Sequence, residues 1–233
     1  FKDKPVDRLT IQDVVQLAEK MRRFTGWLAP DTGCLSPVGK DEFLAGVEKE
    51  FKPEWMHYEL RRGVYAGHPF IVESVVAYGG EVKAPSSGAP AIYRFANKIP
   101  LITSAGECMI TKAVKEINYR QYRLEPTSPV AVFVHVASTR PPWAVLGKES
   151  LRDVDAIHRA IKNSLYPSLR LLSFHISRKQ RQQHARRKAE IYKRYLPRIA
   201  QWSALLAGLE PKEAEKFAKQ ATQTLLRKLE AKA

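Results

Sequence analysis

The sequence predicts an α+β protein in which a small sheet with packed helices is followed by a long projecting helix and preceded by a short all-α segment. Two runs rich in β-branched and aromatic residues, FIVESVVAY (70–78) and PVAVFVHVAS (129–138), predict buried strands. An apolar stripe from Val154 to Ile176 recurs at steps of three and four, which predicts one core-facing helix. Beyond this stripe helix-forming residues continue to Leu196, so the helix is expected to leave its domain.

The first segment, residues 1–33, is expected to be helical. Its predicted helix begins after Thr10, which forms a variant capping box with Asp13. One face of this helix is apolar and consists of Val14, Val15, Leu17, Ala18 and Met21. The turn-rich stretch APDTGCLSPVG (29–39) then breaks the structure, which places a domain boundary after residue 33.

The second segment, residues 34–177, is expected to form the α+β domain. A short helix comes first, and its apolar face consists of Phe43, Leu44, Val47 and Phe51. AIYRFANKIPLI (91–102) predicts one or two further strands, and GECMITKAVKEI (106–117) predicts a helix. The long helix is expected to begin at about Ser150, and Pro167 is expected to kink it or end it briefly.

The third segment, residues 178–233, is expected to extend the long helix as a basic stalk. Between Arg178 and Arg198 the chain has nine Lys and Arg residues and one acid, Glu190. Pro211 opens a final amphipathic helix, whose apolar residues are Ala214, Phe217, Ala218, Ala221, Leu225 and Leu229. We expect this helix either to dock on another subunit, because it has few neighbours in the chain, or to fold back on the stalk.

The charge balance indicates a polyanionic partner. The 39 Lys and Arg residues exceed the 24 Asp and Glu residues by 15, and nucleic acid is the usual partner of such a protein. A basic coat of ribosomal or chromatin type is the alternative. No apolar run reaches the roughly 18 residues of a membrane span, and no signal peptide is visible. The chain begins at Phe1 without an initiator methionine, so we expect a segment of a longer protein.

The sequence contains no complete active site. Its two cysteines lack CxxC spacing and its six histidines form no metal-ligand pattern, which fits a protein of a reducing compartment without structural zinc. DTG (31–33) is interpreted as a turn. Asp153 and Asp155 form a D-x-D pair in the first turns of the long helix, where acids complement the helix dipole. We therefore expect no catalytic residue and no metal ligand in this chain.

Several stretches together resemble the transducer domain of the B subunit of topoisomerase VI, the archaeal-type type IIB DNA topoisomerase. They occur in the order and at the spacing of that family and cover roughly residues 34–200. The stretches are CLSPVG (34–39), YAGHPFIVESVVAYGG (65–80), IYRFANKIPLI (92–102), ITKAVKEINYRQY (110–122) and GKES (147–150). Residues 1–33 resemble the end of the helix–two-turns–helix domain that precedes the transducer in this family.

The resemblance implies a ribosomal-protein-like transducer fold and a role as a relay. An ATPase domain of the gyrase/Hsp90/histidine-kinase/MutL type would precede the chain, bind ATP and Mg²⁺, and dimerise with a second B subunit. The transducer would then pass the signal to the Spo11-like A subunit, which carries the DNA-cleaving tyrosine and acts on duplex DNA. The chain alone would lack both the ATPase pocket and the cleavage tyrosine. The implied location is the cytoplasm of a prokaryote, in association with the nucleoid and not with a membrane.

The resemblance also implies two functional sites. A DNA-contacting tryptophan-lysine-x-tyrosine patch aligns with Tyr119, Arg120 and Tyr122, where a tyrosine and an arginine replace the first two residues. The alternative is that these tyrosines only pack at a helix end. The switch lysine of the family aligns with Lys148, which is expected to contact the γ-phosphate of ATP; an exposed lysine near a helix start is the alternative.

The basic stalk supplies further candidate DNA contacts. Phosphate contacts carry no base information, so binding without sequence preference is expected. The candidates are Arg178, Lys179, Arg186, Arg187 and Lys188.

Two other functions remain open from the sequence. A ribosomal-type nucleic-acid-binding module would share the fold, but it has no reason to hold the stretches GKES and ANKIPLI. A meiotic B-subunit-like partner of a Spo11-like protein would have lost the use of ATP, and Lys148 argues against it.

Overall fold

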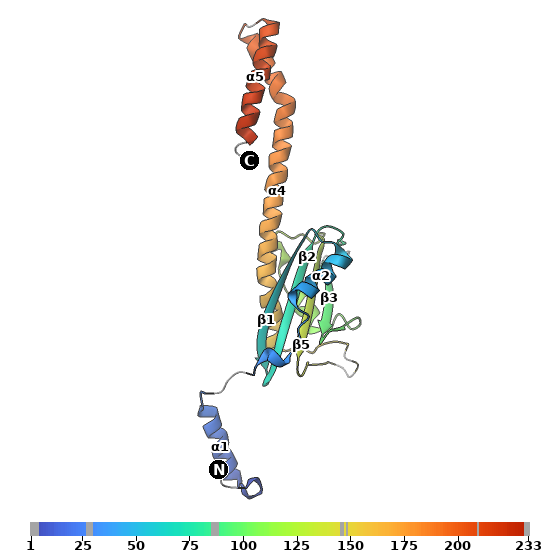
Figure 1. The fold of residues 1–233 in the computed structure, drawn as a ribbon, viewed down its shortest axis with the longest axis vertical. Coiled ribbons are helices and arrows are strands. Elements are labelled where there is room, and N and C mark those ends of the chain that lie inside the picture. The colour runs from blue at the N-terminus through green and yellow to red at the C-terminus, as the bar shows by residue number, and fades with distance from the viewer. Residues whose placement is uncertain are drawn as a thin grey trace.

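The computed structural model describes residues 5–26, 30–84, 89–144, 147, 149–208 and 210–230. Three parts follow one another along its long axis (Figure 1). Helix α1 lies at one end, a sheet with its helices lies in the middle, and a helical hairpin of α4 and α5 projects from the other end. Within the described residues, no helix combines the length and the apolarity that a membrane span requires. The predicted α+β class is confirmed.

The sheet has five strands in the order β1-β2-β5-β3-β4. The strands are β1 Trp55–Tyr65, β2 His68–Tyr78, β3 Ala91–Ala96, β4 Ile99–Pro100 and β5 Val130–Ser138. Every neighbouring pair is antiparallel except β3 with β5, which are parallel. A parallel pair needs a crossover, and residues 101–129 with the short helix α3, Met109–Lys115, supply it. All nine residues of the central strand β5 are buried, as its continuous apolar run predicted.

The strand β1 was missed from the sequence. This strand lies at the edge of the sheet, and charged residues interrupt the apolar residues of its sequence, WMHYELRRGVY. The alternation of apolar and polar positions is therefore hard to recognise. The pairing of β1 with β2 is fixed by the tight turn at Ala66 and Gly67, which both have positive φ angles of 47° and 79°. The stretch 91–102, which was predicted to supply one or two strands, forms two, β3 and β4, separated by a left-handed turn at Asn97 and Lys98.

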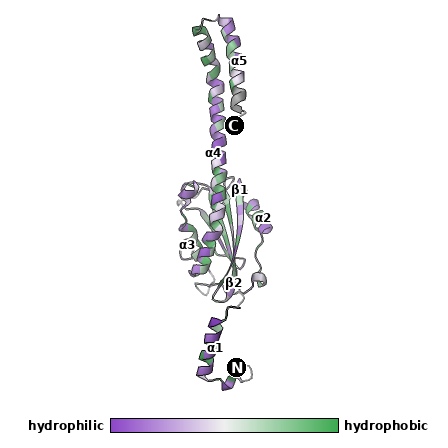
Figure 2. Ribbon diagram, turned by 90° about the vertical axis from the view of Figure 1, so that its left-hand side faces the viewer, coloured by the Kyte–Doolittle hydropathy of each residue, from purple (hydrophilic) through white to green (hydrophobic). Residues whose placement is uncertain are grey.

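Helices cover both faces of the sheet (Figure 2). The helix α2, Lys40–Phe51, packs Phe43 and Val47 on one face. On the other face α3 and the first half of α4 enclose the larger core. The large apolar residues and Ala113 of the stretch 106–117, which was predicted to be helical, are all buried: Met109, Ile110, Ala113, Val114 and Ile117.

The long helix α4 runs without a break from Asp155 to Leu206, 52 residues or about 78 Å. It begins later than the predicted Ser150, because the chain up to residue 152 is held in an extended bridge, and it ends later than Leu196. Of the two outcomes expected at Pro167, a kink or a brief end of the helix, the brief end is wrong, because α4 continues through this residue. Proline removes one backbone hydrogen bond of the helix. Leu165 and Leu169 on either side of Pro167 are fully buried, so their packing in the core keeps the helix continuous.

The last helix, α5 Pro211–Glu230, folds back along the distal part of α4 (Figures 1 and 2). Ala204 of α4 and Ala214 and Ala218 of α5 are buried, since small side chains allow the two helices to approach closely. The expectation that α5 has too few neighbours in the chain is therefore wrong for its alanine face, and the fold-back alternative is confirmed. Phe217 remains half exposed on the same helix.

The helix α1, Ile11–Arg23, begins at the predicted capping box. The Thr10 hydroxyl accepts a hydrogen bond from the Asp13 amide at 3.3 Å, and the Thr10 amide donates to the Asp13 carboxylate at 2.9 Å. No residue of α1 is buried, and Val14, Val15 and Met21 of its apolar face are about half exposed. The predicted apolar face thus forms and remains largely exposed.

Candidate functional site

The predicted DNA patch lies on a short 3-10 helix, Tyr119–Tyr122, directly after α3. Tyr119 packs against the main core, its hydroxyl donates to the Val114 carbonyl at 2.9 Å, and burial raises its pKa above the usual value. Tyr122 is also partly buried against this core, whereas Arg120 is exposed. Of the three residues, Arg120 is therefore the one whose side chain is free to meet a phosphate.

The basic stalk residues lie on α4 and differ in exposure. Arg178, Arg186, Arg187 and Lys188 are exposed, but Lys179 is half buried and pairs with Glu54 at 2.5 Å. The hydrogen bond from Lys179, with a second one from His175, lowers the pKa of Glu54 despite some burial. The charge of Lys179 is therefore partly neutralised within the protein, and Lys179 is the weakest of the predicted phosphate contacts.

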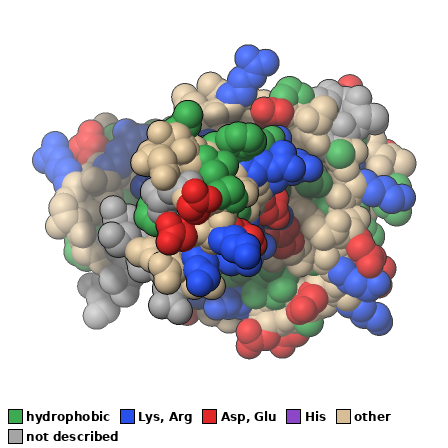
Figure 3. Space-filling view, turned by 90° about the horizontal axis from the view of Figure 1, so that it is seen from above, with side chains coloured by type: hydrophobic (Ala, Val, Ile, Leu, Met, Phe, Trp, Pro, Cys, Tyr) green, Lys and Arg blue, Asp and Glu red, His purple; other side chains and the backbone are tan. Residues whose placement is uncertain are grey.

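The stalk carries its charge around the helix and not on one face. Ile176 is the last residue that α4 buries in the sheet body, and Arg186 lies ten residues, or about 15 Å, beyond it. The nine basic residues fall into three rows by helical spacing: Arg178, Arg181 and Lys188; Lys179, Arg186 and Lys193; and Arg187, Arg194 and Arg198. At the tip, seen from above, basic side chains alternate with acidic and apolar ones (Figure 3).

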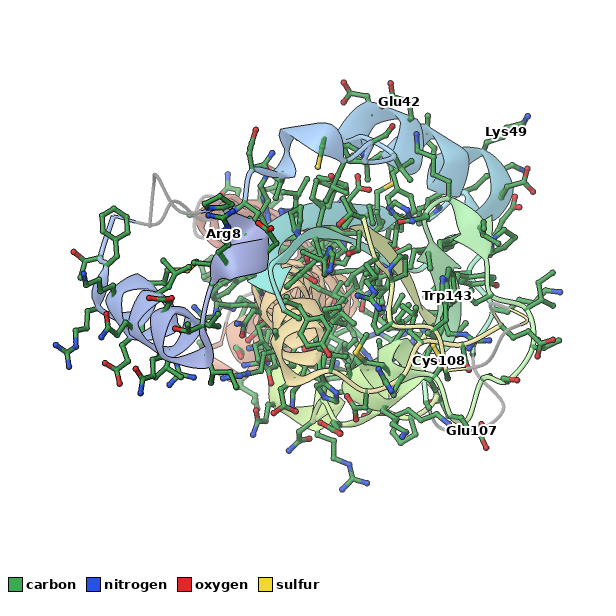
Figure 4. The ribbon with its side chains drawn as sticks, turned by 90° about the horizontal axis from the view of Figure 1, so that it is seen from below. Arg8, Glu42, Lys49, Glu107, Cys108 and Trp143 are labelled. Carbon is green, nitrogen blue, oxygen red and sulfur yellow. The ribbon has the colours of Figure 1, made fainter. Side chains whose placement is uncertain are left out.

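Lys148 lies outside the described residues, but the backbone on both sides of its loop is fixed. Trp143 and Leu151 form an antiparallel bridge, the Ala144 amide donates to the Ser150 carbonyl at 2.9 Å, and the Arg152 amide donates to the Pro142 carbonyl at 2.8 Å. Leu151 is fully buried and Trp143 packs partly on the core. In Figure 4 Trp143 lies on the same side of the sheet as Cys108, opposite Glu42 and Lys49 of α2. The loop between residues 144 and 150 is therefore anchored at both ends just before α4.

A buried network around Glu73 was missed from the sequence. Glu73 of β2 and His135 of β5 are paired across the sheet, and both side chains are fully buried. The Glu73 carboxylate accepts hydrogen bonds from the Val38 amide at 2.8 Å, the Gly39 amide at 2.9 Å and the Tyr58 hydroxyl at 2.8 Å. His135 Nδ1 lies 2.7 Å from the same carboxylate.

The hydrogen atoms of this network can be assigned. His135 Nε2 accepts from the Lys98 amide at 3.0 Å, so the ring hydrogen is on Nδ1 and is donated to Glu73. Burial on its own would raise the pKa of Glu73, but the hydrogen bonds from His135, from the two amides and from Tyr58 outweigh it and lower this pKa to about 2. Glu73 is therefore ionised and satisfied by four donors.

The network joins the segment after α1 to the sheet. Val38 and Gly39 belong to the loop between α1 and α2, and Lys98 Nζ adds a bond to Ser36 of the same loop at 2.9 Å. Residues of β1, β2 and β5 and of the β3–β4 turn thus hold this loop through hydrogen bonds. A signal was present in the sequence, because Glu73 and His135 are the only acidic or basic residues in the two most apolar runs.

No metal centre is present in the described part of the chain, where no three His, Cys, Asp or Glu side chains cluster to hold an ion. The two acids of the D-x-D pair, Asp153 and Asp155, lie close to the start of α4. Asp153 lies 3.0 Å from His158 Nδ1, and Asp155 is the first residue of α4. Asp155 thus agrees with the expected role at the helix start, whereas Asp153 lies before the N-cap residue Val154 and outside the first turn.

These features define a class of protein with a small α+β body and a long helix. One end of this helix is buried in the body and the other end projects far beyond it, and the body carries a basic turn on its surface. The chain belongs to the family described as topoisomerase VI B subunit, transducer, whose family model matches residues 30–188. The resemblance drawn from the sequence is thereby confirmed.

Relatives support the same assignment. The chain is 33% identical, over 99% of its length, to the B subunit of type 2 DNA topoisomerase 6 from Metallosphaera sedula, and covers 44% of that protein. It is 34% identical, over 91% of its length, to the protein of the same name from Saccharolobus solfataricus, and covers 40% of that protein. The chain thus spans less than half the length of these relatives.

Among solved structures, the 43K ATPase domain of Thermus thermophilus gyrase B aligns with 66% of the chain and 46% of its own length. The identity is 15% and the TM-score is 0.36, too low to support an inference.

Proposed function

We propose that this chain is the relay part of the B subunit of an ATP-dependent DNA topoisomerase VI. In this proposal a preceding domain binds ATP and Mg²⁺ and pairs with a second B subunit. The chain passes binding and hydrolysis on to an A subunit, which cleaves DNA and allows strand passage. The membership of the chain in the transducer family and the name of its relatives, which are B subunits of a type 2 DNA topoisomerase, support this function. The proposed location is the prokaryotic cytoplasm, on the nucleoid.

The observation that carries the proposal is the continuity of α4. Its first half is rooted in the core through fully buried residues such as Ile161 and Leu169, so α4 must move with the sheet. From Ile176 to Leu206 it projects about 45 Å with no break in the helix. A small rotation of the body is therefore enlarged at the tip, as a relay between distant domains requires.

A flexible break in the stalk tests this relay. A short Gly-Ser linker inserted after His184 interrupts α4 beyond the body and leaves the core untouched. In the intact two-subunit enzyme we expect ATP hydrolysis to continue while supercoil relaxation per ATP falls. The matched control places the same linker beside Gly208, between α4 and α5, where the chain already turns. Unchanged relaxation per ATP after the His184 insertion would contradict the proposal.

The A subunit is proposed to bind the exposed apolar stripe near the tip of α4. Residues of this stripe follow one another at steps of three and four on one face of the helix: Ile191, Tyr195, Ile199, Trp202 and Leu206. Trp202 is 65% exposed and Leu206 is 88% exposed, and α5 packs on a different face through its alanines. An exposed stripe of this kind is typical of a protein interface. In this proposal the docking surface is the stripe of α4, whereas the sequence led us to expect α5 either to dock on another subunit or to fold back on the stalk.

DNA and ATP contacts complete the proposal. The basic stalk and Arg120 are proposed to meet duplex phosphates without reading sequence, with Tyr119 and Tyr122 supporting the turn that carries Arg120. Lys148 is proposed to meet the γ-phosphate of ATP bound in the preceding domain. The anchored ends of its loop support this role, because a contact made at Lys148 would be passed directly to the start of α4.

A further inference from the structure

An arginine is buried in this protein without an acidic partner. Arg94 of β3 is 6% exposed. Its Nη2 donates to the carbonyl oxygens of Leu101 at 2.7 Å and Thr103 at 3.0 Å, both of which are neutral. Among the described residues, no carboxylate pairs with it. A buried charge is costly unless an opposite charge compensates it, so this guanidinium calls for an anion.

Two buried donors that line the same pocket also lack an acceptor within the described part of the chain. Arg94 Nη1 and the hydroxyl of Thr111, a residue of α3 that is 4% exposed, have no hydrogen-bond partner there. Buried donors without acceptors are rare in folded proteins, because each costs free energy. Both residues line one pocket of about 450 Å³ between β3, α3 and the segment after β4. Lys115, the last residue of α3, lies at this pocket too.

From these observations we infer that the pocket between β3 and α3 binds a phosphate-type oxyanion through Arg94, Thr111 and Lys115. The two charged side chains of its lining are both cationic, and none is acidic. A cation is therefore repelled, and a purely apolar ligand would leave the buried donors unpaired. Arg94, Thr111 and Lys115 all line this pocket, and a guanidinium, a hydroxyl and an ammonium together suit an oxyanion with several acceptor oxygens.

The position of the pocket indicates where the phosphate comes from. Lys115 also lines a neighbouring shallow pocket of about 280 Å³, whose wall includes Arg120 of the predicted DNA patch. A phosphate of a DNA strand lying on Arg120 and a free phosphate or nucleotide are the two sources of the same chemistry. The inference concerns a binding site and does not depend on the proposed relay.

The test uses the 233-residue chain with inorganic phosphate and with a short labelled duplex. Thr111→Val removes only the hydroxyl that has no partner, and Lys115→Gln removes an exposed charge, so both variants should fold. Lys112→Gln is the matched control, since Lys112 is an exposed lysine of the same helix outside the pocket lining. Thermal melting is measured in phosphate and in chloride at equal ionic strength, and duplex binding is measured by anisotropy.

We expect phosphate to raise the melting temperature of the wild type and of Lys112→Gln, with about tenfold weaker phosphate binding in each pocket variant. Weaker duplex binding by the same variants, together with competition by phosphate, would identify DNA as the source. A change in the phosphate response alone would identify a free phosphate. If both pocket variants match Lys112→Gln in phosphate and on duplex, the inference is overturned and the buried donors bond only to water.

Discussion

Replacing Glu73 by glutamine should loosen the loop between α1 and α2 from the sheet. The carboxylate accepts four hydrogen bonds, from two loop amides, Tyr58 and His135. An amide side chain of the same size can accept on its oxygen only. Its NH₂ group would face donors, so at least one buried donor loses its acceptor. The change keeps the volume of the core and therefore isolates the charge and the hydrogen bonds.

The magnitude follows from the pKa of Glu73, which falls from 4.5 to about 2 in the folded protein. This difference corresponds to roughly 3 kcal/mol of stability for the ionised carboxylate. Because the folded-state pKa is lowered, the contribution is complete above about pH 5 and is lost as the pH falls through 4.5 toward 2. Glu73→Gln should therefore lower the free energy of unfolding by roughly 3 kcal/mol at pH 7, and by much less near pH 2.

Urea unfolding followed by circular dichroism, repeated from pH 7 down to the acid limit of the fold, measures this difference. Amide hydrogen exchange at Val38 and Gly39 adds a local measurement, and both amides should exchange faster in the variant. Glu81→Gln is the control, because Glu81 pairs with Lys52 at 3.0 Å on the surface and should contribute at most about 1 kcal/mol. The reasoning is refuted if Glu73→Gln costs no more than this control, or if its cost does not shrink with acid.

Three further predictions concern the proposed function. Lys148→Ala in the intact two-subunit enzyme should lower both ATP hydrolysis and supercoil relaxation, and wild-type rates in both assays would exclude a switch. Replacing residues 186–188 by glutamine should weaken duplex binding and reduce its salt slope by about 0.9 for each lost phosphate contact, whereas an unchanged slope would indicate a merely solvated helix face. Trp202→Ala should weaken A-subunit pull-down by about tenfold or more, and Phe217→Ala on α5 should not; equal effects would argue against the α4 stripe.

Local patterns were sufficient to predict the parts of the fold that one chain segment determines by itself. β5 is apolar at nearly every position because both of its faces are covered, and α4 shows its stripe because one face meets a sheet. The capping box at Thr10 involves atoms only three residues apart. Such features need no knowledge of the tertiary structure.

The errors arose where distant residues decide the structure. Pro167 is a helix breaker by propensity, yet packing on the sheet keeps α4 intact, and that packing depends on residues far away in the sequence. α5 looked unpartnered because its contact with α4 buries alanines, Ala204 of α4 with Ala214 and Ala218 of α5, and alanines give a weak apolar pattern. β1 was hidden by the charged residues of an edge strand.

The site was predictable only in part for the same reason. The basic stalk is visible in composition alone, and the Tyr119–Tyr122 turn was found by resemblance. The burial of Tyr119 and the pairing of Lys179 with Glu54 depend on contacts across the fold. The Glu73 network joins residues up to 62 positions apart, so the sequence could mark Glu73 and His135 as unusual but could not pair them.

In the proposed relay, two anchored loops would act together, because each connects one end of the chain to the same sheet. The loop after α1 is held by Glu73 in the middle of the sheet, and the loop before α4 is held by Trp143 and Leu151 against the core. Between them lies a sheet whose central strand is buried on both faces and cannot easily change its register. In the proposed relay, a displacement of the segment before α2 is therefore expected to pass through the sheet to α4. Loosening Glu73 should weaken this connection while leaving the stalk itself intact, which separates the input of the proposed relay from its output.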